Sequence, residues 1–462
     1  MGKRRPAASA PALSPLERFV FGPVLELRLA LLRRLFLLLL AFDLWLEFAE
    51  HGGRYGIGGF NVAHFAWLDA LMPLPTPGLY VASVCLAGCL ALLSALLPLP
   101  RWVGVLLALV YTYTWAMSML DSYQHHYLLS LMLAFLAFFP QPPFEEAKAN
   151  EEIESATLGR SISAWAYVGL LLQTAIVYGY TMVAKLDPLW REGQVLRRIA
   201  GSHEPFRALA SLWAGAGLSP TTFWSLLSLG VAGLQALLAL AYALAAFRDR
   251  AGGETWAPVY AAGWAGAFAF HLGIELSDFE IGWFSYYMLT LATIVFAPAR
   301  WLQAACALSL HAWHKASASM KALHSSQARP SLKPALVWLL GASPSLLLLY
   351  GVAQSDLPGL PALALILAPA TLVLLLFLAR TGRTSLWQGA LALTLTFGAL
   401  LCALRLSEVR FDYYRFVGSE AKRRGDLGEA LIAYRKANLY APTDKNRKRE
   451  EQEVRNALHA RP

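Results

Sequence analysis

Residues 162–184 read ISAWAYVGLLLQTAIVYGYTMVA and are followed directly by Lys185. This stretch has no charged side chain, and a membrane-crossing helix needs about 20 mostly apolar residues. Only a helix or a closed barrel can satisfy every backbone polar group inside a bilayer. The stretch therefore predicts a transmembrane helix.

Similar apolar runs lie on both sides of this stretch. They cover residues 27–48, 78–98, 102–120, 124–140, 222–246, 257–275, 282–298, 334–352, 359–379 and 386–405. Together they predict an all-α fold, a polytopic transmembrane helix bundle of about eleven spans.

The composition agrees with a membrane protein. Of the 462 residues, 57% are apolar and 15% are charged, whereas a soluble protein has about 25% charged residues. An ordinary water-soluble enzyme is therefore excluded. The 39 basic and 30 acidic residues give a net charge of +9. Much of the excess lies at the N-terminus, in short loops and in the C-terminal tail, which predicts a lipid bilayer rather than a nucleic acid as the partner.

The loop charges predict the topology. Arg101 and Arg380 fall in loops on one side of the predicted bundle, and Asp121 and Asp356 fall in loops on the other. Basic loops are enriched on the cytoplasmic side. We therefore expect residues 1–19 to be a cytoplasmic N-terminal tail.

Two further regions follow the segment 20–300. Residues 301–405 read as an amphipathic linker and three extra transmembrane helices, and residues 406–462 as a charged, soluble helical hairpin. The hairpin resembles a single tetratricopeptide repeat, whose small, aromatic and proline positions are matched by Gly425, Ala430, Tyr434, Ala437 and Pro442. One such repeat cannot bury its own face, so we expect it to dock onto another surface.

No sequence motif indicates a metal or a common nucleophile. The four cysteines are too few for a disulfide scaffold, and no cysteine and histidine spacing fits zinc. A phosphate-binding glycine loop, a nucleophile elbow and an HExxH motif are all absent from the sequence. We therefore expect no metal.

Lys185 stands at a predicted break between two helices. The apolar run ends at Lys185, and Asp187 with Pro188 has the pattern of an N-cap followed by the first residue of a new helix. A lysine removed from water loses proton affinity and can act as a base. A lysine that extends to the lipid headgroups is an equally good interpretation.

Polar residues inside the other apolar runs are costly and therefore informative. His125 and His126 open the run 124–140, where an imidazole can exchange protons or anchor the helix at the interface. His271 lies within the run 257–275, with Glu275 one turn later as its expected partner. Further buried polar candidates are Asp43, Gln173 and Tyr178.

Four segments resemble one known family in the same order along the chain. They are AHFAWLDALMPLP (63–75), QHHYL (124–128), VAKLDPLW (183–190), and the pair Phe270-His271 with the later Phe296-Ala297-Pro298. Over about residues 20–300 the chain resembles the vitamin K-dependent gamma-carboxylases. It also resembles the broader HTTM (horizontally transferred transmembrane) domain family to which they belong.

The resemblance implies a carbon-carbon lyase mechanism. A lysine, here Lys185, deprotonates a reduced naphthoquinone, either vitamin K hydroquinone or menaquinol. Reaction with O2 gives a strong base that removes a γ-proton from glutamate, and the carbanion attacks CO2. His126 matches the catalytic histidine that positions the reacting groups. The residues expected to bind the quinol are His271, His125, Tyr178 and Gln173.

The sequence differs from the animal carboxylases at several positions, and these differences leave a second function open. Ala184 stands where the animal enzymes carry a second lysine, and His125 stands where they carry asparagine. After residue 300, three spans and the tail replace the large domain that binds a propeptide. The alternative is a non-enzymatic HTTM module that binds a partner protein through its tail. As an enzyme, the chain is expected in a bacterial inner (plasma) membrane, with a peptide or protein as acceptor.

Overall fold

The computed structural model describes two compact units. They are formed by residues 1–33 with 138–311, and by residues 34–137 with 312–462. Apart from four isolated residues, the described residues are 20–54, 76–96, 99–116, 124–139, 161–248, 257–276, 281–308, 405–441 and 447–460.

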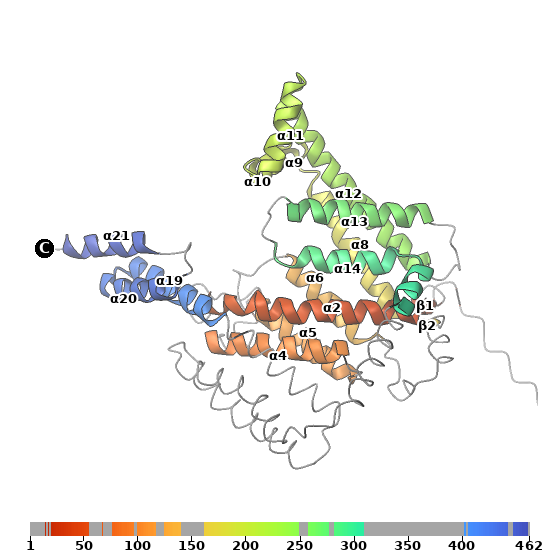
Figure 1. Cartoon of the computed structure of the whole chain (residues 1–462), viewed down its shortest axis with the longest axis horizontal. Helices are drawn as coiled ribbons and strands as arrows, with labels where there is room; N and C mark the ends of the chain where they lie inside the picture. The colour runs from red at the N-terminus through yellow and green to blue at the C-terminus, as the bar shows by residue number, and fades with distance from the viewer. Residues whose placement is uncertain are drawn as a thin grey trace, which may run out of the picture. The chain divides into compact units, whose positions relative to one another are not determined.

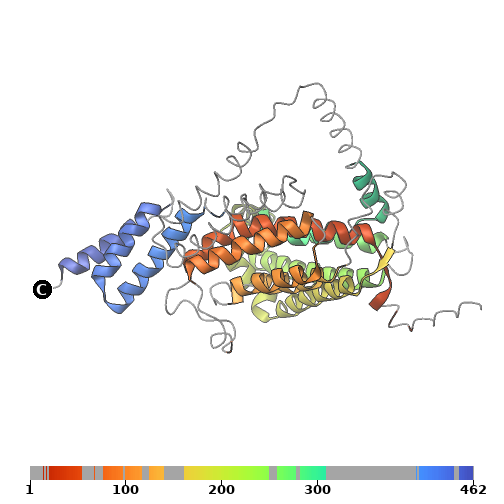
Figure 2. The same cartoon turned by 90° about the horizontal axis from the view of Figure 1, so that it is seen from below.

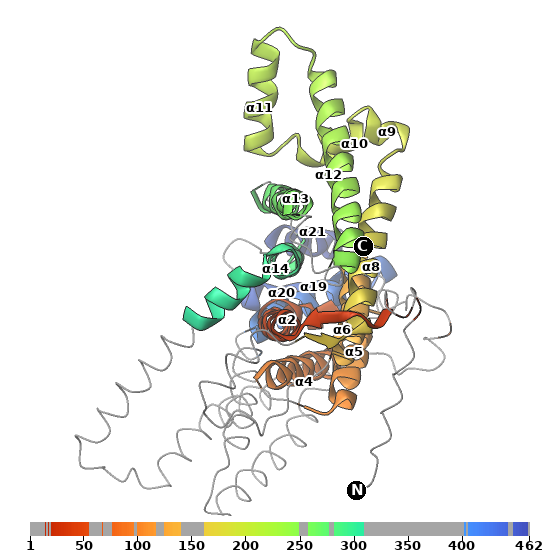
Figure 3. The same ribbon diagram turned by 90° about the vertical axis from the view of Figure 1, so that its right-hand side faces the viewer.

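The first unit is built on four long helices. These are α8 (Trp165–Ala184), α12 (Pro220–Arg248), α13 (Ala257–Leu276) and α14 (Phe284–Phe296). They pack in series, with α8 on α12, α12 on α13, and α13 on α14. Figure 3 shows α8 and α12 side by side along much of their length. Tyr242 of α12 is buried against Tyr178 of α8 and against Phe296, so aromatic rings fill the space between these helices.

Three short helices connect α8 to α12. They are α9 (Pro188–Arg191), α10 (Gln194–Ala200) and α11 (Glu204–Gly215). In Figure 1 they lie at one end of α8 and α12. No residue of α11 is buried, and Leu212 is 72% exposed. Exposed apolar side chains on such a helix are typical of a segment that lies at a membrane interface.

A small sheet departs from the predicted all-helical fold. Strand β1 (Pro23–Leu25) pairs antiparallel with β2 (Ser161–Ser163), with Val24 opposite Ile162. Strands of three residues carry too little alternation to be recognised in a sequence, and here they precede α2 and α8.

The second unit contains η1 (Phe48–Arg54), α4 (Pro77–Leu96), α5 (Arg101–Ala116) and α6 (Gln124–Ala137). Helix α2 (Glu26–Leu46) begins in the residues of the first unit and continues in those of the second. Helix α4 packs on α5, and α5 on α6. Trp45 of α2 is fully buried, and its indole N–H donates to the carbonyl of Cys85 at 3.3 Å.

Within the described residues, three helices are long and apolar enough to cross a membrane: α4, α8 and residues 220–246 of α12. A fourth span is formed if α14 is joined to residues 299–308, which meet it at a bend of 108° after Pro298. The predicted total of about eleven is not confirmed. Helices α5 and α6 are shorter, α2 carries four charged side chains between Arg28 and Asp43, and the runs at 334–352, 359–379 and 386–405 lie outside the described residues.

The tail forms the predicted helical hairpin with a third helix added. Helix α19 (Leu406–Arg424) packs on α20 (Leu427–Tyr440), and α21 (Lys448–His459) follows (Figure 2). Gly425 has a φ of 80° between the first two helices, a left-handed conformation that favours glycine. Ala430, Tyr434 and Ala437 are buried, as close helix packing requires. The likeness to a tetratricopeptide repeat stays a prediction.

The tail docks onto η1 of the same unit. A Cβ atom on Gly53 would lie 2.4 Å from the carbonyl oxygen of Val409, so the two backbones are in direct contact. Ion pairs join Arg54 to Asp412 at 3.9 Å and Arg405 to Glu50 at 3.7 Å. The expected docking partner of the hairpin is therefore, in part, this chain itself.

Gly88 provides a test of the packing between α4 and α2. A Cβ atom there would lie 2.2 Å from Nε1 of the buried Trp45. We expect Gly88→Ala to lower the free energy of unfolding by about 1–3 kcal/mol, because overpacked cores must shift. Thermal unfolding in detergent measures the effect. Gly230→Ala is the control, since nothing lies within 4 Å of its Cβ position, and equal behaviour of the two variants would contradict the packing.

Candidate active site

The helix break at Lys185 lies where the sequence predicts it. Helix α8 ends at Ala184, and the backbone N–H of Lys185 still donates to the carbonyl of Met182 at 2.9 Å. The Asp187 carboxylate accepts from the N–H of Leu189 at 2.9 Å and caps α9, which begins at Pro188. Local hydrogen bonds therefore hold the backbone on both sides of Lys185, at the end of α8 and at the start of α9.

The Lys185 ammonium has weak partners. Its Nζ lies 3.5 Å from the carbonyl oxygen of Thr181 and 4.9 Å from the centroid of the Trp190 ring. None of the ion pairs among the described residues includes Lys185. Burial lowers the pKa of Lys185 below its ordinary value. Lys185 therefore releases its proton more readily than an exposed lysine does.

Tyr178 and Lys185 lie on one face of α8. They are seven residues apart, which is close to two turns and about 10 Å along the axis. Thr181 lies between them on the same face, and its hydroxyl donates to the carbonyl of Tyr178 at 3.0 Å. Gln173, which is half-buried, lies on another face by the same helix geometry. By this geometry Tyr178 and Lys185 lie on the same side of the helix, about 10 Å apart, and Gln173 lies on another side.

His271 forms a buried polar pair with Tyr178. The Tyr178 hydroxyl lies 2.6 Å from Nε2 of His271, and both side chains are buried. Tyr242 stacks on Tyr178 at 5.8 Å between ring centroids, and Phe270 packs edge-on against both members of the pair. An imidazole and a phenol together can donate and accept hydrogen bonds inside an aromatic environment.

The expected partner of His271 was wrong. Glu275 was expected because residues four apart share a helix face, but His271 binds Tyr178 of another helix instead. The His271 Nδ1 and Glu275 Oε1 atoms are buried without a hydrogen-bond partner among the described residues, so they do not pair with each other. A tertiary contact between α8 and α13 has replaced the local one.

His126 is buried in the second unit. Its Nδ1 lies 3.1 Å from the Tyr111 hydroxyl of α5, and its ring packs edge-on against Phe48 at 4.9 Å between centroids. His125 is half-buried, and its ring centroid lies 4.2 Å from that of His126. The structure therefore brings His125 and His126 into contact in the second unit, and Tyr178 and His271 into contact in the first unit, which also contains Lys185.

Tyr111 and Phe48 contact His126 and were not among the residues predicted from the sequence. Tyr111 is fully buried in an apolar helix. A buried hydroxyl needs a hydrogen-bond partner. A tyrosine within the apolar run 102–120 therefore indicated that another polar group lies nearby. Its spacing of 15 residues from His126 gave no indication of the contact, because the two residues lie on different helices.

Among the residues that the structure describes, one cluster could hold a metal ion. The possible ligand atoms of Glu47, Glu50 and His51 all lie within 4.8 Å of one another. Glu50 also pairs with Arg405 of the tail at 3.7 Å. This pairing gives the cluster a structural role in joining η1 to α19.

Comparison with known families matches residues 21–301 to the HTTM domain. The matched segment contains all six residues predicted for the site. No solved structure matches the chain. The resemblance to the HTTM family, inferred from four short segments, is thereby confirmed.

Proposed function

Because the chain belongs to the HTTM domain family, the membrane-protein family related to vitamin K-dependent carboxylases, we propose that it is a quinol-dependent, gamma-glutamyl carboxylase-like enzyme. Its cofactors would be a reduced naphthoquinone (vitamin K hydroquinone or menaquinol), O2 and CO2. When bound, the quinol would supply the strong base that removes a γ-proton from glutamate.

The observation that carries the proposal is the position of Lys185. The reaction needs a neutral amine next to an apolar site, and burial lowers the pKa of this lysine. No carboxylate in the described part of the chain pairs with it, so nothing there holds the ammonium form. Trp190 covers one side of the amine at 4.9 Å, and its ring would also restrict water.

The His271–Tyr178 pair fits a planar quinol. A quinol presents hydroxyl groups at two ring edges and a flat aromatic face. The phenol and imidazole of this pair can bind such hydroxyls, and the rings of Tyr242 and Phe270 provide aromatic surfaces nearby. These side chains lie on α8, α12 and α13, where α12 packs against both of the other helices.

His126 would position a reacting group or relay a proton. The contact between its Nδ1 and the Tyr111 hydroxyl at 3.1 Å orients the ring. His125, half-buried beside it, would contribute to the same region. Gln173 is the weakest of the proposed quinol ligands, because it lies away from the face of α8 that carries Tyr178 and Lys185.

The proposal extends to topology and location. The chain is a membrane protein with apolar helices long enough to span. We place it in the inner (plasma) membrane of a bacterium, with a cytoplasmic N-terminus and about eleven spans, three of them from the runs after residue 333. The acceptor would be a peptide or protein.

A second candidate function is a non-enzymatic module that binds a partner protein through the tail. It is favoured by the independent core of α19–α21 and by the exposure of Ile432 (60%) and Leu439 (79%). Deletion of residues 406–462 distinguishes the two functions. The enzyme should still oxidise quinol without its tail, provided the truncated protein folds, whereas a binding module should lose its function.

Product formation tests the proposed reaction. The protein would be purified in detergent with lipid and supplied with each reduced naphthoquinone, O2, labelled bicarbonate and a glutamate-containing peptide. We expect quinone epoxide, followed by mass spectrometry, and label in the peptide. Epoxide without label would restrict the function to quinol oxidation, and folded protein that forms no epoxide with either quinol would overturn the proposal.

A further inference from the structure

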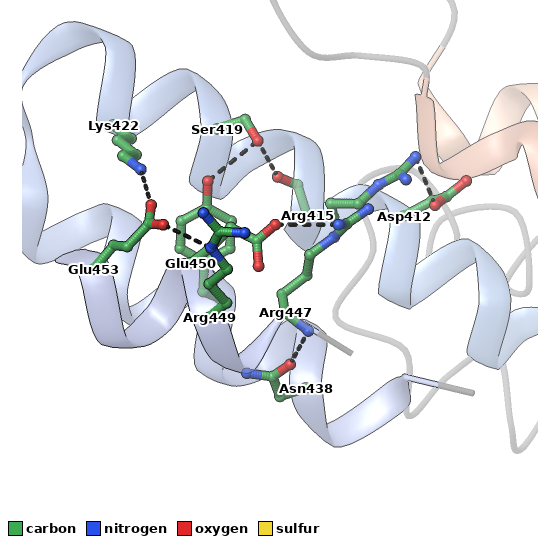
Figure 4. Close-up of polar contacts among 10 residues, drawn as sticks. Asp412, Arg415, Ser419, Lys422, Asn438, Arg447, Arg449, Glu450 and Glu453 are labelled. Carbon is green, nitrogen blue, oxygen red and sulfur yellow. Dashed lines mark hydrogen bonds and ion pairs between the residues drawn. The ribbon is translucent and has the colours of Figure 1, made fainter. Parts of the chain in front are cut away.

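The tail contains a pocket of about 430 Å³ that the proposed quinol chemistry does not use. It lies among α19, α20 and the start of α21. It is lined by Arg415, Phe416, Ser419, Tyr434, Arg447 and Glu450. Figure 4 shows four of these side chains, those of Arg415, Ser419, Arg447 and Glu450. Its volume falls within the range of about 300–1,000 Å³ that is usual for ligand sites.

Two arginines from different helices face this pocket. Arg415 pairs with Asp412 at 3.0 Å, and Arg447 pairs with Glu450 at 3.2 Å. Arginine has five N–H donors, and these pairs leave several of them unused. The Nε atoms of Arg415 and Arg447 are buried and have no hydrogen-bond partner among the described residues. Both guanidinium groups can therefore donate hydrogen bonds to a further, anionic ligand.

The charge balance of the pocket is positive by one unit. Its lining carries the two guanidinium groups of Arg415 and Arg447 and the carboxylate of Glu450. Burial, and then the charges of Arg447 and Arg54, lower the pKa of Arg415 despite the opposing effect of Asp412. This mutual repulsion of the arginines would be relieved by one additional negative charge.

The rest of the lining is apolar with two hydroxyl groups. The Arg415 guanidinium lies 4.7 Å from the Phe416 ring centroid, so it is already held over an aromatic face. The Ser419 hydroxyl donates to the carbonyl of Arg415 at 2.9 Å and lies 3.2 Å from the Tyr434 hydroxyl. A ligand that suits this lining has a carboxylate on a short aliphatic stem.

We propose that this pocket binds a carboxylate of an acidic peptide segment. A carboxylate carries the single charge that the pocket lacks, whereas a phosphate group carries about −1.5 to −2 at neutral pH. Arginine forks bind carboxylates through paired hydrogen bonds. The methylene groups of a glutamate side chain would contact Phe416 and Tyr434. That this peptide is the acceptor for carboxylation rests on the proposed function; the binding itself does not.

Peptide binding to the full chain in detergent, without quinol, tests the proposal. The probe is a fluorescently labelled peptide rich in glutamate, compared with the same peptide carrying glutamine at each of those positions. We expect the wild-type chain to bind only the glutamate peptide. Arg447→Gln should weaken binding about tenfold or more, since charge-assisted bonds are lost. Equal binding of the glutamine peptide would overturn the proposal.

Two further variants separate binding from folding. The backbone N–H of Arg447 donates to Asn438 Oδ1 at 2.6 Å, and this bond survives substitution of the side chain. Glu450→Gln removes the competing internal carboxylate and should tighten binding several-fold, a gain that misfolding cannot produce. Arg455→Gln, on the same helix but paired with Glu451 outside the pocket, is the matched control and should bind like wild type. Unchanged binding in both Arg447→Gln and Glu450→Gln would contradict the assignment.

Competition distinguishes the chemical source of the anion. Acetate should displace the peptide at least as well as inorganic phosphate does at equal concentration. Much stronger displacement by phosphate would overturn the carboxylate assignment and indicate a phosphate-bearing ligand. The binding assay contains no quinol, so failure of peptide binding would contradict this proposal without contradicting the proposed epoxide formation. Lys185→Ala should still bind the peptide.

Discussion

Lys185→Ala is expected to lower quinone epoxide formation at least about 100-fold, within the range of 10²–10⁴ that general acid–base catalysis contributes. The amine is the group we propose to remove the quinol proton, and no other lysine lies in α8–α10. The measurement is the initial rate of epoxide formation at saturating quinol. Peptide carboxylation should fall in parallel, because it depends on the same first step.

The variant Lys185→Arg distinguishes two roles of Lys185, as a catalytic base or as an anchor in the lipid headgroups. Arginine keeps the positive charge and can still extend to lipid or lie over Trp190, but it does not lose its proton in proteins. We therefore expect it to be as inactive as the alanine variant. Asp187→Asn is the matched control two residues away, since asparagine also caps helices well. Substantial activity in Lys185→Arg would refute the role of Lys185 as the base.

The activity of the wild-type enzyme should also depend on pH in a defined direction. Lysine acts as a base only when neutral, and burial lowers the pKa of Lys185 below its ordinary value. The rate should rise with pH through the pKa of Lys185 and then level off, at a lower pH than an exposed lysine would give.

The sequence predicted the positions of the described helices well, because each apolar run is bounded by charged residues or prolines. Helix α8 ends at Ala184, as the run 162–184 does, and α13 ends one residue beyond the run 257–275. The break at Lys185 was predictable because Asp187 and Pro188 act locally on the backbone. Such local signals need no knowledge of tertiary packing.

Contacts between helices could not be predicted in the same way. The sequence predicted Glu275 as the hydrogen-bond partner of His271, but the partner is Tyr178, 93 residues earlier in the chain. Tyr111 pairs with His126 because α5 packs on α6. These pairings depend on how helices rotate and approach each other, which hydrophobic periodicity alone does not define. The same is true of Arg28, whose role became evident only from the structure.

Arg28→Met is expected to destabilise the first unit by about 1–3 kcal/mol, the usual cost of leaving buried polar groups without a hydrogen-bond partner. The Arg28 guanidinium is buried and donates to the carbonyls of Ile294 and Val295, and to that of Ala297 at 3.1 Å. The last carbonyls of a helix have no intrahelical donor. Helix α14 ends at Phe296, and Pro298 has no N–H to offer them.

Arg28 therefore acts as a side-chain cap, and its charge also opposes the negative end of the α14 dipole. Thermal unfolding in detergent measures the loss, with exposed Arg34→Met on the same helix as the control, expected to stay within about 0.5 kcal/mol of wild type. Arg28→Lys should be intermediate, because an ammonium keeps the charge but cannot reach three carbonyls in the same plane. If Arg28→Met unfolded at the same temperature as Arg34→Met, the carbonyls would have another donor, and the capping role would be wrong.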